Sequence, residues 1–181
     1  MALVKPVIFQ VVGYQNSGKT TFLLSLIQML TEQGYRVMTI KHHGHGGKPE
    51  GTQQKDSSRH LEAGASASLV EGDGSLILQA NAISWSLEEQ ISLMEHLQPE
   101  ILLIEGHKQE SFPKLILIRN NSDLQLLTKL DNIKAVICWE EELFTFSQAL
   151  KVPFFHISDQ NAIHQIADSI KQCVHKDNPE S

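Results

Sequence analysis

Residues 13–20 of the chain read Gly13-Tyr14-Gln15-Asn16-Ser17-Gly18-Lys19-Thr20. The stretch fits the pattern G-x-x-x-x-G-K-[ST], in which glycines let successive backbone N–H groups surround a phosphate at the positive end of a helix. The pattern predicts that Lys19 reaches the β- and γ-phosphates and that the Thr20 hydroxyl is a ligand of Mg²⁺. The next residue, Thr21, is expected to donate to the α-phosphate.

The flanks of this loop supply the strand and the helix that such a site needs. Residues 7–12 form a short apolar, β-branched run, which is typical of a buried strand. Beyond the loop, apolar residues recur at helical spacing until Gly34, which marks a helix end. Residues 36–40 then predict a second strand, and the order strand, helix, strand indicates a right-handed parallel unit.

The rest of the chain continues this alternation. Apolar runs predict further strands at 101–104, 115–118, 135–138 and 153–156, and two short runs around Gly72-Asp73-Gly74 predict a β-hairpin. A short helix is predicted at 56–63. Ser86 is expected to cap a second helix, which includes Leu97 and is ended by Pro99, and Asp159 is expected to cap the last helix. We therefore expect a three-layer α/β/α domain of the P-loop NTPase kind over residues 1–175, with a mostly parallel sheet, an inserted hairpin and a frayed polar tail at 176–181.

Composition narrows the class of partner. Lys and Arg total 15 against 21 Asp and Glu among 181 residues, a net charge of −6, so no nucleic-acid partner is expected. No run approaches the roughly 18 apolar residues of a membrane span, and the first residues lack a signal peptide. We expect a cytoplasmic protein without a membrane partner. Its two cysteines, Cys138 and Cys173, are expected to be small buried hydrophobes.

A second element of the nucleotide site ends the predicted strand 101–104. The run Ile101-Leu102-Leu103-Ile104-Glu105-Gly106 is an apolar strand followed by a carboxylate, the arrangement that holds Mg²⁺ in nucleotide-hydrolysing proteins. The usual residue is Asp, and this chain has Glu105. We expect Glu105 to share the Mg²⁺ with Thr20, and the N–H of Gly106 to approach the γ-phosphate.

Residues 41–60 contain four of the nine histidines, His42, His43, His45 and His60. Three interpretations stay open for this stretch: contact with phosphate or a partner, a metal site, or a solvated polar loop. Lys41 and His42 directly follow a predicted strand, so they are expected at the carboxyl edge of the sheet, where ligands bind.

Recognition of the base is left open. Residues Thr128-Lys129-Leu130-Asp131 resemble the [NT]-K-x-D element that reads guanine in many GTPases, or form a turn before the strand at 133–138. The acidic stretch Trp139-Glu140-Glu141-Glu142 follows that strand and is the alternative source of a base-reading carboxylate.

Taken together, the motifs resemble the family of molybdopterin-guanine dinucleotide biosynthesis accessory protein B (MobB). The resemblance rests on the phosphate loop with its strand, on Thr39-Ile40-Lys41-His42-His43, on Lys55-Asp56-Ser57-Ser58-Arg59 with Ala63-Gly64-Ala65, and on Leu102-Leu103-Ile104-Glu105-Gly106. It implies a weakly GTP-hydrolysing protein that assists attachment of GMP to the molybdenum cofactor. It also implies a separate molybdopterin guanylyltransferase and other molybdenum-cofactor proteins as partners, and a homodimer whose sheet extends across subunits.

The same resemblance assigns site residues. Phosphate contacts fall to Gly13, Asn16, Ser17, Gly18, Lys19 and Thr21, and Mg²⁺ to Thr20 and Glu105. The loop side of the site receives Lys41, His42, Asp56 and Arg59. Lys19, Glu105 and Arg59 are the candidates for catalytic roles in GTP hydrolysis. In this chain the loop contains Gly44-His45-Gly46-Gly47 and has no Asp between 42 and 55, whereas the family has an Asp-rich loop there.

Other functions use the same phosphate loop. A small-molecule kinase is one, although a kinase lid usually carries several arginines and this chain has arginine only at 36, 59 and 119. A metal-delivery GTPase is another, supported by the histidines alone. A non-catalytic GTP-binding module is the third.

Overall fold

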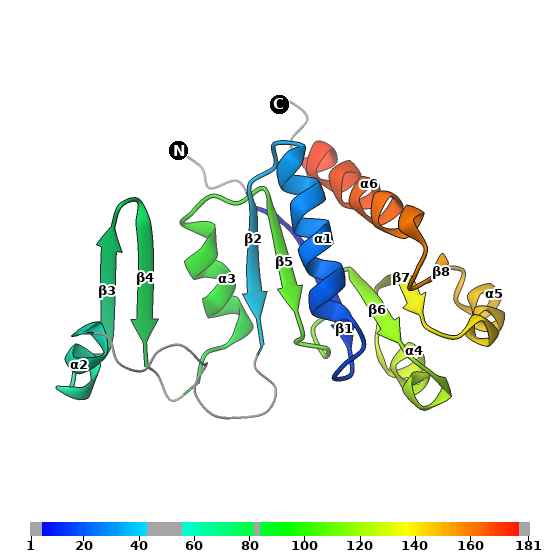
Figure 1. The fold of residues 1–181 in the computed structure, drawn as a ribbon, viewed down its shortest axis with the longest axis horizontal. Coiled ribbons are helices and arrows are strands. Elements are labelled where there is room, and N and C mark those ends of the chain that lie inside the picture. Colours follow the sequence, from blue (N-terminus) through cyan, green and yellow to red (C-terminus); the bar gives the residue numbers. More distant parts are fainter. Residues whose placement is uncertain (1–4, 43–55, 82–83, 178–181) are drawn as a thin grey trace. The chain divides into compact units, whose positions relative to one another are not determined.

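A six-stranded sheet, in which every strand runs parallel to its neighbours, carries the phosphate loop (Figure 1). The strand order is β2-β5-β1-β6-β7-β8. Their bounds are β1 (Val7–Gly13), β2 (Val37–Lys41), β5 (Ile101–Glu105), β6 (Lys114–Ile118), β7 (Ile133–Cys138) and β8 (Phe154–His156). Strands β2 and β5 lie on one side of β1, and β6, β7 and β8 lie on the other. The carboxyl end of β1 is therefore the switch point, where ligands bind in such sheets. Figure 1 shows β2, β5 and β6 ending at the same lower edge.

This structure is a computed structural model that describes residues 5–42, 56–81 and 84–177, with the side chains of 56–58 and 176–177 also outside the description. The chain forms two compact units, one of Met1–His42 with Ile91–Ser181 and one of His43–Gln90. The single domain over 1–175 and the tail at 176–181 stay predictions. Among the described residues, no helix is long and apolar enough to cross a membrane.

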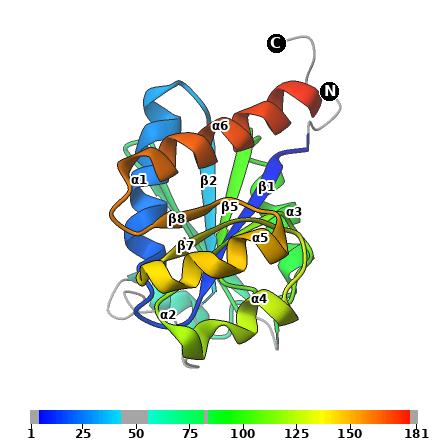
Figure 2. The ribbon, with the colours of Figure 1, turned by 90° about the vertical axis from the view of Figure 1, so that its right-hand side faces the viewer.

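The sheet is buried on both faces, which explains its near-continuous apolar strands. Val11 and its face neighbours pack against α1 (Lys19–Glu32) and α6 (Gln160–Asp177). Val12 and the opposite face pack against α4 (Gln125–Lys129) and the 3₁₀ segment η2 (Glu141–Phe146). Figure 2 shows α1 to the left of β2 and β5. The short elements η1 (Asn121–Asp123) and α5 (Ser147–Leu150) complete this unit. The expected layered α/β fold is confirmed.

The predicted helix caps are confirmed, but one predicted helix is too long. Asp159 accepts a hydrogen bond from the N–H of Asn161 (2.8 Å) at the start of α6, and Ser86 and Glu89 bond each other's N–H groups at the start of α3 (Leu87–Glu95). Leu97 lies beyond α3 and is 52% exposed. Bonds spanning three residues tighten the chain there, and Gln98 has a φ of 55°, so the helix ends before Leu97.

The second unit contains the predicted hairpin. Strands β3 (Ala67–Gly72) and β4 (Ser75–Ala80) pair antiparallel around Asp73 and Gly74, whose φ values are both positive, as a tight two-residue turn requires. Helix α2 (Asp56–Glu62) precedes them. The hairpin is confirmed, and it forms a sheet of its own instead of joining the parallel one.

The cysteine prediction is half right. Cys138 is buried at the end of β7, and this burial raises the pKa of its thiol to about 11. Cys173 is exposed on α6, contrary to the expectation.

Candidate functional site

The loop between β1 and α1 passes close to the neighbouring strand β6. A Cβ on Gly13 would lie 2.6 Å from the Ser17 hydroxyl oxygen and 2.7 Å from the carbonyl oxygen of Leu117, so only glycine fits there. Gly18 has a φ of +92°, which side chains rarely adopt. The Ser17 hydroxyl is buried and has no hydrogen-bond partner within the described part of the chain. A buried, unpaired hydroxyl inside a tight loop fits a site that receives a polar ligand.

Thr20 and Glu105 meet at the carboxyl edge of the sheet. In the strand register Glu105 lies beside Val11 of β1 and Lys41 of β2. The Thr20 hydroxyl donates to Oε1 of Glu105 over 2.9 Å, and the Lys41 ammonium lies 3.3 Å from Oε2. Lys41 Nζ also donates to the Thr20 hydroxyl oxygen over 3.3 Å. The structure therefore places these three predicted residues in one cluster.

Hard oxygen ligands of this kind suit Mg²⁺. A hydroxyl and a carboxylate within hydrogen-bond distance, beside a phosphate loop, are the donors that Mg²⁺ sites combine with substrate phosphates. Thr20 and Glu105 therefore fit the predicted metal role.

Lys19 lies among several positive charges. Its ammonium donates to the carbonyl oxygen of Tyr14 over 2.7 Å. Burial lowers the pKa of Lys19, and the charges of Lys108, Lys41 and Arg119 lower it further, while Glu105 opposes them. A phosphate group bound here would relieve this repulsion. The local charge therefore favours an anionic ligand.

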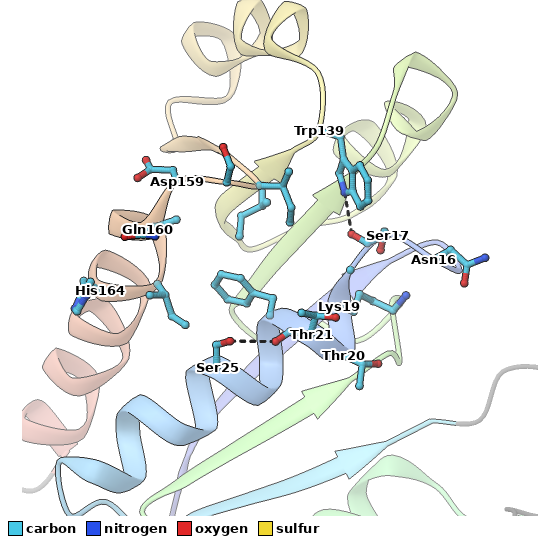
Figure 3. Close-up of a pocket in the computed structure, with 17 residues that line it drawn as sticks. Asn16, Ser17, Lys19, Thr20, Thr21, Ser25, Trp139, Asp159, Gln160 and His164 are labelled. Atoms are coloured by element: carbon cyan, nitrogen blue, oxygen red, sulfur yellow. Dashed lines mark hydrogen bonds between the residues drawn. The ribbon is translucent and has the colours of Figure 1, made fainter.

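A cavity of about 830 Å³ extends from the phosphate loop to the start of α6 (Figure 3). Apolar side chains line it, namely Phe22, Ile137, Ile157 and Ile163, together with polar groups of Ser158, Asp159, Gln160 and His164. Figure 3 shows Trp139 beside the loop, with its indole N–H donating to the carbonyl of Ser17 over 3.1 Å. An apolar pocket with a few polar groups, continuous with a phosphate loop, suits a nucleoside.

His156 joins two parts of this pocket wall. Its Nε2 lies 2.9 Å from the carbonyl oxygen of Trp139, and its Nδ1 lies 2.7 Å from the hydroxyl of Ser158. Because a carbonyl only accepts, we assign the ring hydrogen to Nε2, so Nδ1 accepts from Ser158. The ring therefore fixes the segment after β7 against the segment after β8.

Most of the predicted site residues lie together at the carboxyl edge of the parallel sheet, whereas two of them, Asp56 and Arg59, belong to the second unit. Residues 13–21, Lys41 and Glu105 surround the loop, and the backbone N–H of His42 donates to the carbonyl of Glu105 over 2.9 Å. Asp56 and Arg59 lie on α2 in the second unit, so their roles stay predictions.

The histidine stretch is only partly described. His43 and His45 lie outside the described residues, as does the expected departure at 44–47. The ring centres of His42 and His107 are 4.6 Å apart. Among the described residues, no group of three or more His, Cys, Asp and Glu side chains is placed to hold a metal ion.

One expectation about nucleotide contacts needs correction, and one of the two interpretations left open for residues 128–131 is favoured. The N–H of Gly106 donates to the carbonyl of Val11 over 3.1 Å, so β1 takes up the group expected near the γ-phosphate. Residues 128–131 precede β7 and therefore lie at the amino edge of the sheet, away from the phosphate loop. There Asp131 accepts from Ser111 (2.9 Å) and Lys114 (3.1 Å), which favours the turn over the guanine-reading element.

The alternative acidic stretch also contributes differently than expected. Trp139 lines the pocket, whereas the three glutamates after it do not, and the carboxylate on the pocket wall belongs to Asp159. Sequence reasoning missed Lys108, whose ammonium lies 4.4 Å from the ring centre of Tyr14, and Arg119, whose side chain pairs with Asp123. Arg119 directly follows β6, and a position just after a predicted parallel strand could have indicated that it lies at the ligand-binding edge of the sheet.

A phosphate loop at the central strand, with a carboxylate on the adjacent strand, defines a nucleotide-binding protein of the P-loop NTPase fold. The family model described as molybdopterin guanine dinucleotide synthesis protein B, MobB, matches residues 8–139. The chain belongs to this family.

Curated relatives and solved structures agree with this family. The chain is 42% identical over 173 residues to a probable molybdopterin-guanine dinucleotide biosynthesis adapter protein of Bacillus subtilis, covering 94% of this chain and 98% of the relative. An adapter protein of Haemophilus influenzae with the same description is 31% identical, over 91% of this chain and 88% of the relative. The crystal structure of Bacillus subtilis MobB superposes with a TM-score of 0.78 at 40% identity, covering 89% of this chain and 96% of that one.

Proposed function

We propose that this chain is an adapter in molybdopterin-guanine dinucleotide biosynthesis that binds GTP with Mg²⁺ and hydrolyses it slowly. The observation that carries the proposal is the contact of Thr20 with Glu105 near the Lys19 ammonium at the switch point, in a chain 42% identical to a probable adapter of this pathway. The adjoining pocket provides room for a nucleoside.

The chain's own groups divide the work of nucleotide binding. Backbone N–H groups of residues 13–21 and the Lys19 ammonium bind the phosphates, and the Ser17 hydroxyl gains the partner it lacks. Thr20 and Glu105 would hold Mg²⁺, which would supply positive charge against the bound phosphates. Trp139 and Ile157 line the pocket that would receive the nucleoside and offer it apolar contacts.

One titration tests this function. Calorimetry with GTP and with ATP, each with and without Mg²⁺, is expected to show Mg²⁺-dependent binding and a preference for GTP. Absence of binding by either nucleotide would refute the proposal. Equal affinity for GTP and ATP would support the phosphate site but refute the preference for guanine.

Partner proteins follow from the adapter role. We propose that the guanylyltransferase that attaches GMP to molybdopterin docks on the GTP-bound chain. Co-sedimentation of the two purified proteins should then depend on GTP and Mg²⁺. If the complex forms equally well without nucleotide, docking does not depend on the nucleotide site.

A homodimer is the second part of the proposal, supported by the hairpin. Large apolar side chains of β3 and β4 are strongly exposed in the single chain: Leu69, Val70, Leu76, Ile77 and Leu78. A two-stranded sheet with exposed edges and apolar side chains favours pairing with a second copy. Sedimentation equilibrium should give a dimer for the native chain and a monomer for Leu76→Lys. A monomeric native chain would contradict the dimer and leave nucleotide binding unaffected.

A further inference from the structure

Glu105 has little access to solvent and depends on a nearby cation. Its side chain is 8% exposed, and a buried carboxylate is costly unless it is paired. The Thr20 hydroxyl satisfies one of its oxygens at 2.9 Å, and the Lys41 ammonium lies 3.3 Å from the other. Lys41 therefore supplies the positive charge that this carboxylate needs.

The same ammonium contacts both groups that are assigned to Mg²⁺. Lys41 Nζ is 3.3 Å from the Thr20 hydroxyl oxygen as well as 3.3 Å from the Glu105 carboxylate. A Mg²⁺ ion lies about 2.1 Å from its oxygen ligands, so an ion on Thr20 would be within a few ångströms of the ammonium. Two cations at such a distance repel each other strongly near a partly buried carboxylate. Lys41 and Mg²⁺ therefore compete for the same two oxygens.

Lys41 is able to leave its position at little cost. Its side chain is 57% exposed, whereas the carboxylate it pairs with is nearly buried. It is the last residue of β2 at the carboxyl edge of the sheet, the edge to which the phosphate loop and Glu105 also belong. A long exposed lysine there is free to rotate its side chain into solvent.

We propose that Lys41 is an exchangeable cation: it neutralises Glu105 and contacts the Thr20 hydroxyl until Mg²⁺ takes its place, and its side chain then turns away into solvent. This inference rests on the proposed nucleotide function and deepens it. Its consequence is that Lys41 lets a nucleotide bind without Mg²⁺ and raises the Mg²⁺ concentration needed for saturation.

The test measures GDP affinity by calorimetry, with saturating Mg²⁺ and with excess EDTA, so that hydrolysis plays no part. Lys41→Met is expected to weaken GDP binding about tenfold in EDTA, because the Glu105 carboxylate then lies unneutralised beside the phosphates. In Mg²⁺ the loss should be less than about threefold, because the metal ion neutralises Glu105 instead. At fixed GDP, the variant is expected to saturate at a lower Mg²⁺ concentration than the native chain. Lys41→Arg should restore the native behaviour in EDTA.

Lys108→Met is the matched control, because it removes one charge near the loop from a lysine over the Tyr14 ring. Its GDP affinity should fall by a similar factor in both conditions, leaving the Mg²⁺ dependence unchanged. A Lys41→Met variant with native Mg²⁺ dependence, or one that needs more Mg²⁺, overturns the proposal. If the native chain binds GDP in neither condition, the proposed nucleotide function fails instead.

Discussion

The indole N–H of Trp139 donates to the carbonyl of Ser17 over 3.1 Å, which joins the end of β7 to the middle of the phosphate loop. Trp139 also lines the pocket proposed for the nucleoside, so one side chain contacts both the phosphate loop and this pocket.

Trp139→Phe tests this connection, because it keeps an apolar ring and removes the N–H. Loss of one neutral hydrogen bond costs about 0.5–1.5 kcal/mol, so GTP affinity is expected to fall roughly twofold to tenfold.

Trp85 is the only other tryptophan, so a Trp85→Phe background makes Trp139 the sole indole reporter. Its fluorescence should change on addition of GTP. A silent signal with intact binding would place the nucleoside elsewhere.

Lys19→Ala addresses the phosphate contact. A charge-assisted bond contributes about 1.5–3 kcal/mol, so GTP binding should weaken about ten- to a hundred-fold. Calorimetry measures the affinity, and circular dichroism checks the fold. Unchanged affinity in a folded variant would exclude Lys19 as the phosphate anchor.

Glu105→Gln separates metal binding from nucleotide binding. Glutamine keeps an acceptor for the Thr20 hydroxyl at 2.9 Å but removes the negative charge. Hydrolysis should fall much more than GDP affinity, because the metal matters most as charge moves onto the leaving group. Phosphate release and GDP calorimetry are the two measurements. Equal losses in both would indicate that Glu105 only supports the fold of the site.

Asp123 provides a pH-dependent prediction. Burial alone would raise the pKa of Asp123, but hydrogen bonds from the Arg119 side chain and backbone hold that pKa below its ordinary value of 3.8. The stabilisation is therefore complete above that value and is lost as the pH falls through the lowered pKa. Because Arg119 is 35% exposed, we expect Asp123→Asn to cost only about 1–2 kcal/mol near neutral pH.

Urea unfolding of the native chain and of Asp123→Asn checks this at neutral and acidic pH. The difference in free energy of unfolding should shrink below the ordinary pKa of an aspartate. A difference that stays constant over the whole range would show that the hydrogen bonds do not depend on the charge of Asp123.

Local sequence patterns were enough to predict the phosphate loop and the Thr20–Glu105 pair. Both residues belong to short motifs attached to a strand or a helix, and in a parallel sheet the ends of such strands meet. The contact of Trp139 with Ser17 spans 122 residues and depends on the strand order, in particular on β7 lying beyond β6 on the same side of β1. Local periodicity carries no information on that order.

The short helical elements were also missed, for a related reason. Helix α4 and segment η2 are five and six residues long, too short to show a helical period, and tertiary packing of Leu126 and Leu143 holds them in place. Lys108 and Arg119 act on Lys19 through space, so their effect appears only once β5 and β6 are placed on either side of β1.

The last prediction is that the isolated chain hydrolyses GTP slowly and that a partner accelerates it. Phosphoryl transfer gains about 10³–10⁵ in rate from an arginine placed against the transition state. Arg119, the arginine that acts on Lys19, is held by Asp123 through two side-chain bonds of 3.0 and 3.1 Å. Turnover of the isolated chain should therefore lie far below the enzyme median of about 10 s⁻¹.

Arg59 is the candidate for the accelerating group. Steady-state phosphate release should rise when the guanylyltransferase is added, and Arg59→Ala should remove this stimulation. Arg36→Ala is a charge-matched control, because Arg36 contacts the Leu97 carbonyl at the amino edge of the sheet, away from the phosphate loop. Stimulation that survives Arg59→Ala would assign the accelerating group to the partner. Fast turnover by the isolated chain would contradict the adapter function and indicate an enzyme that acts alone.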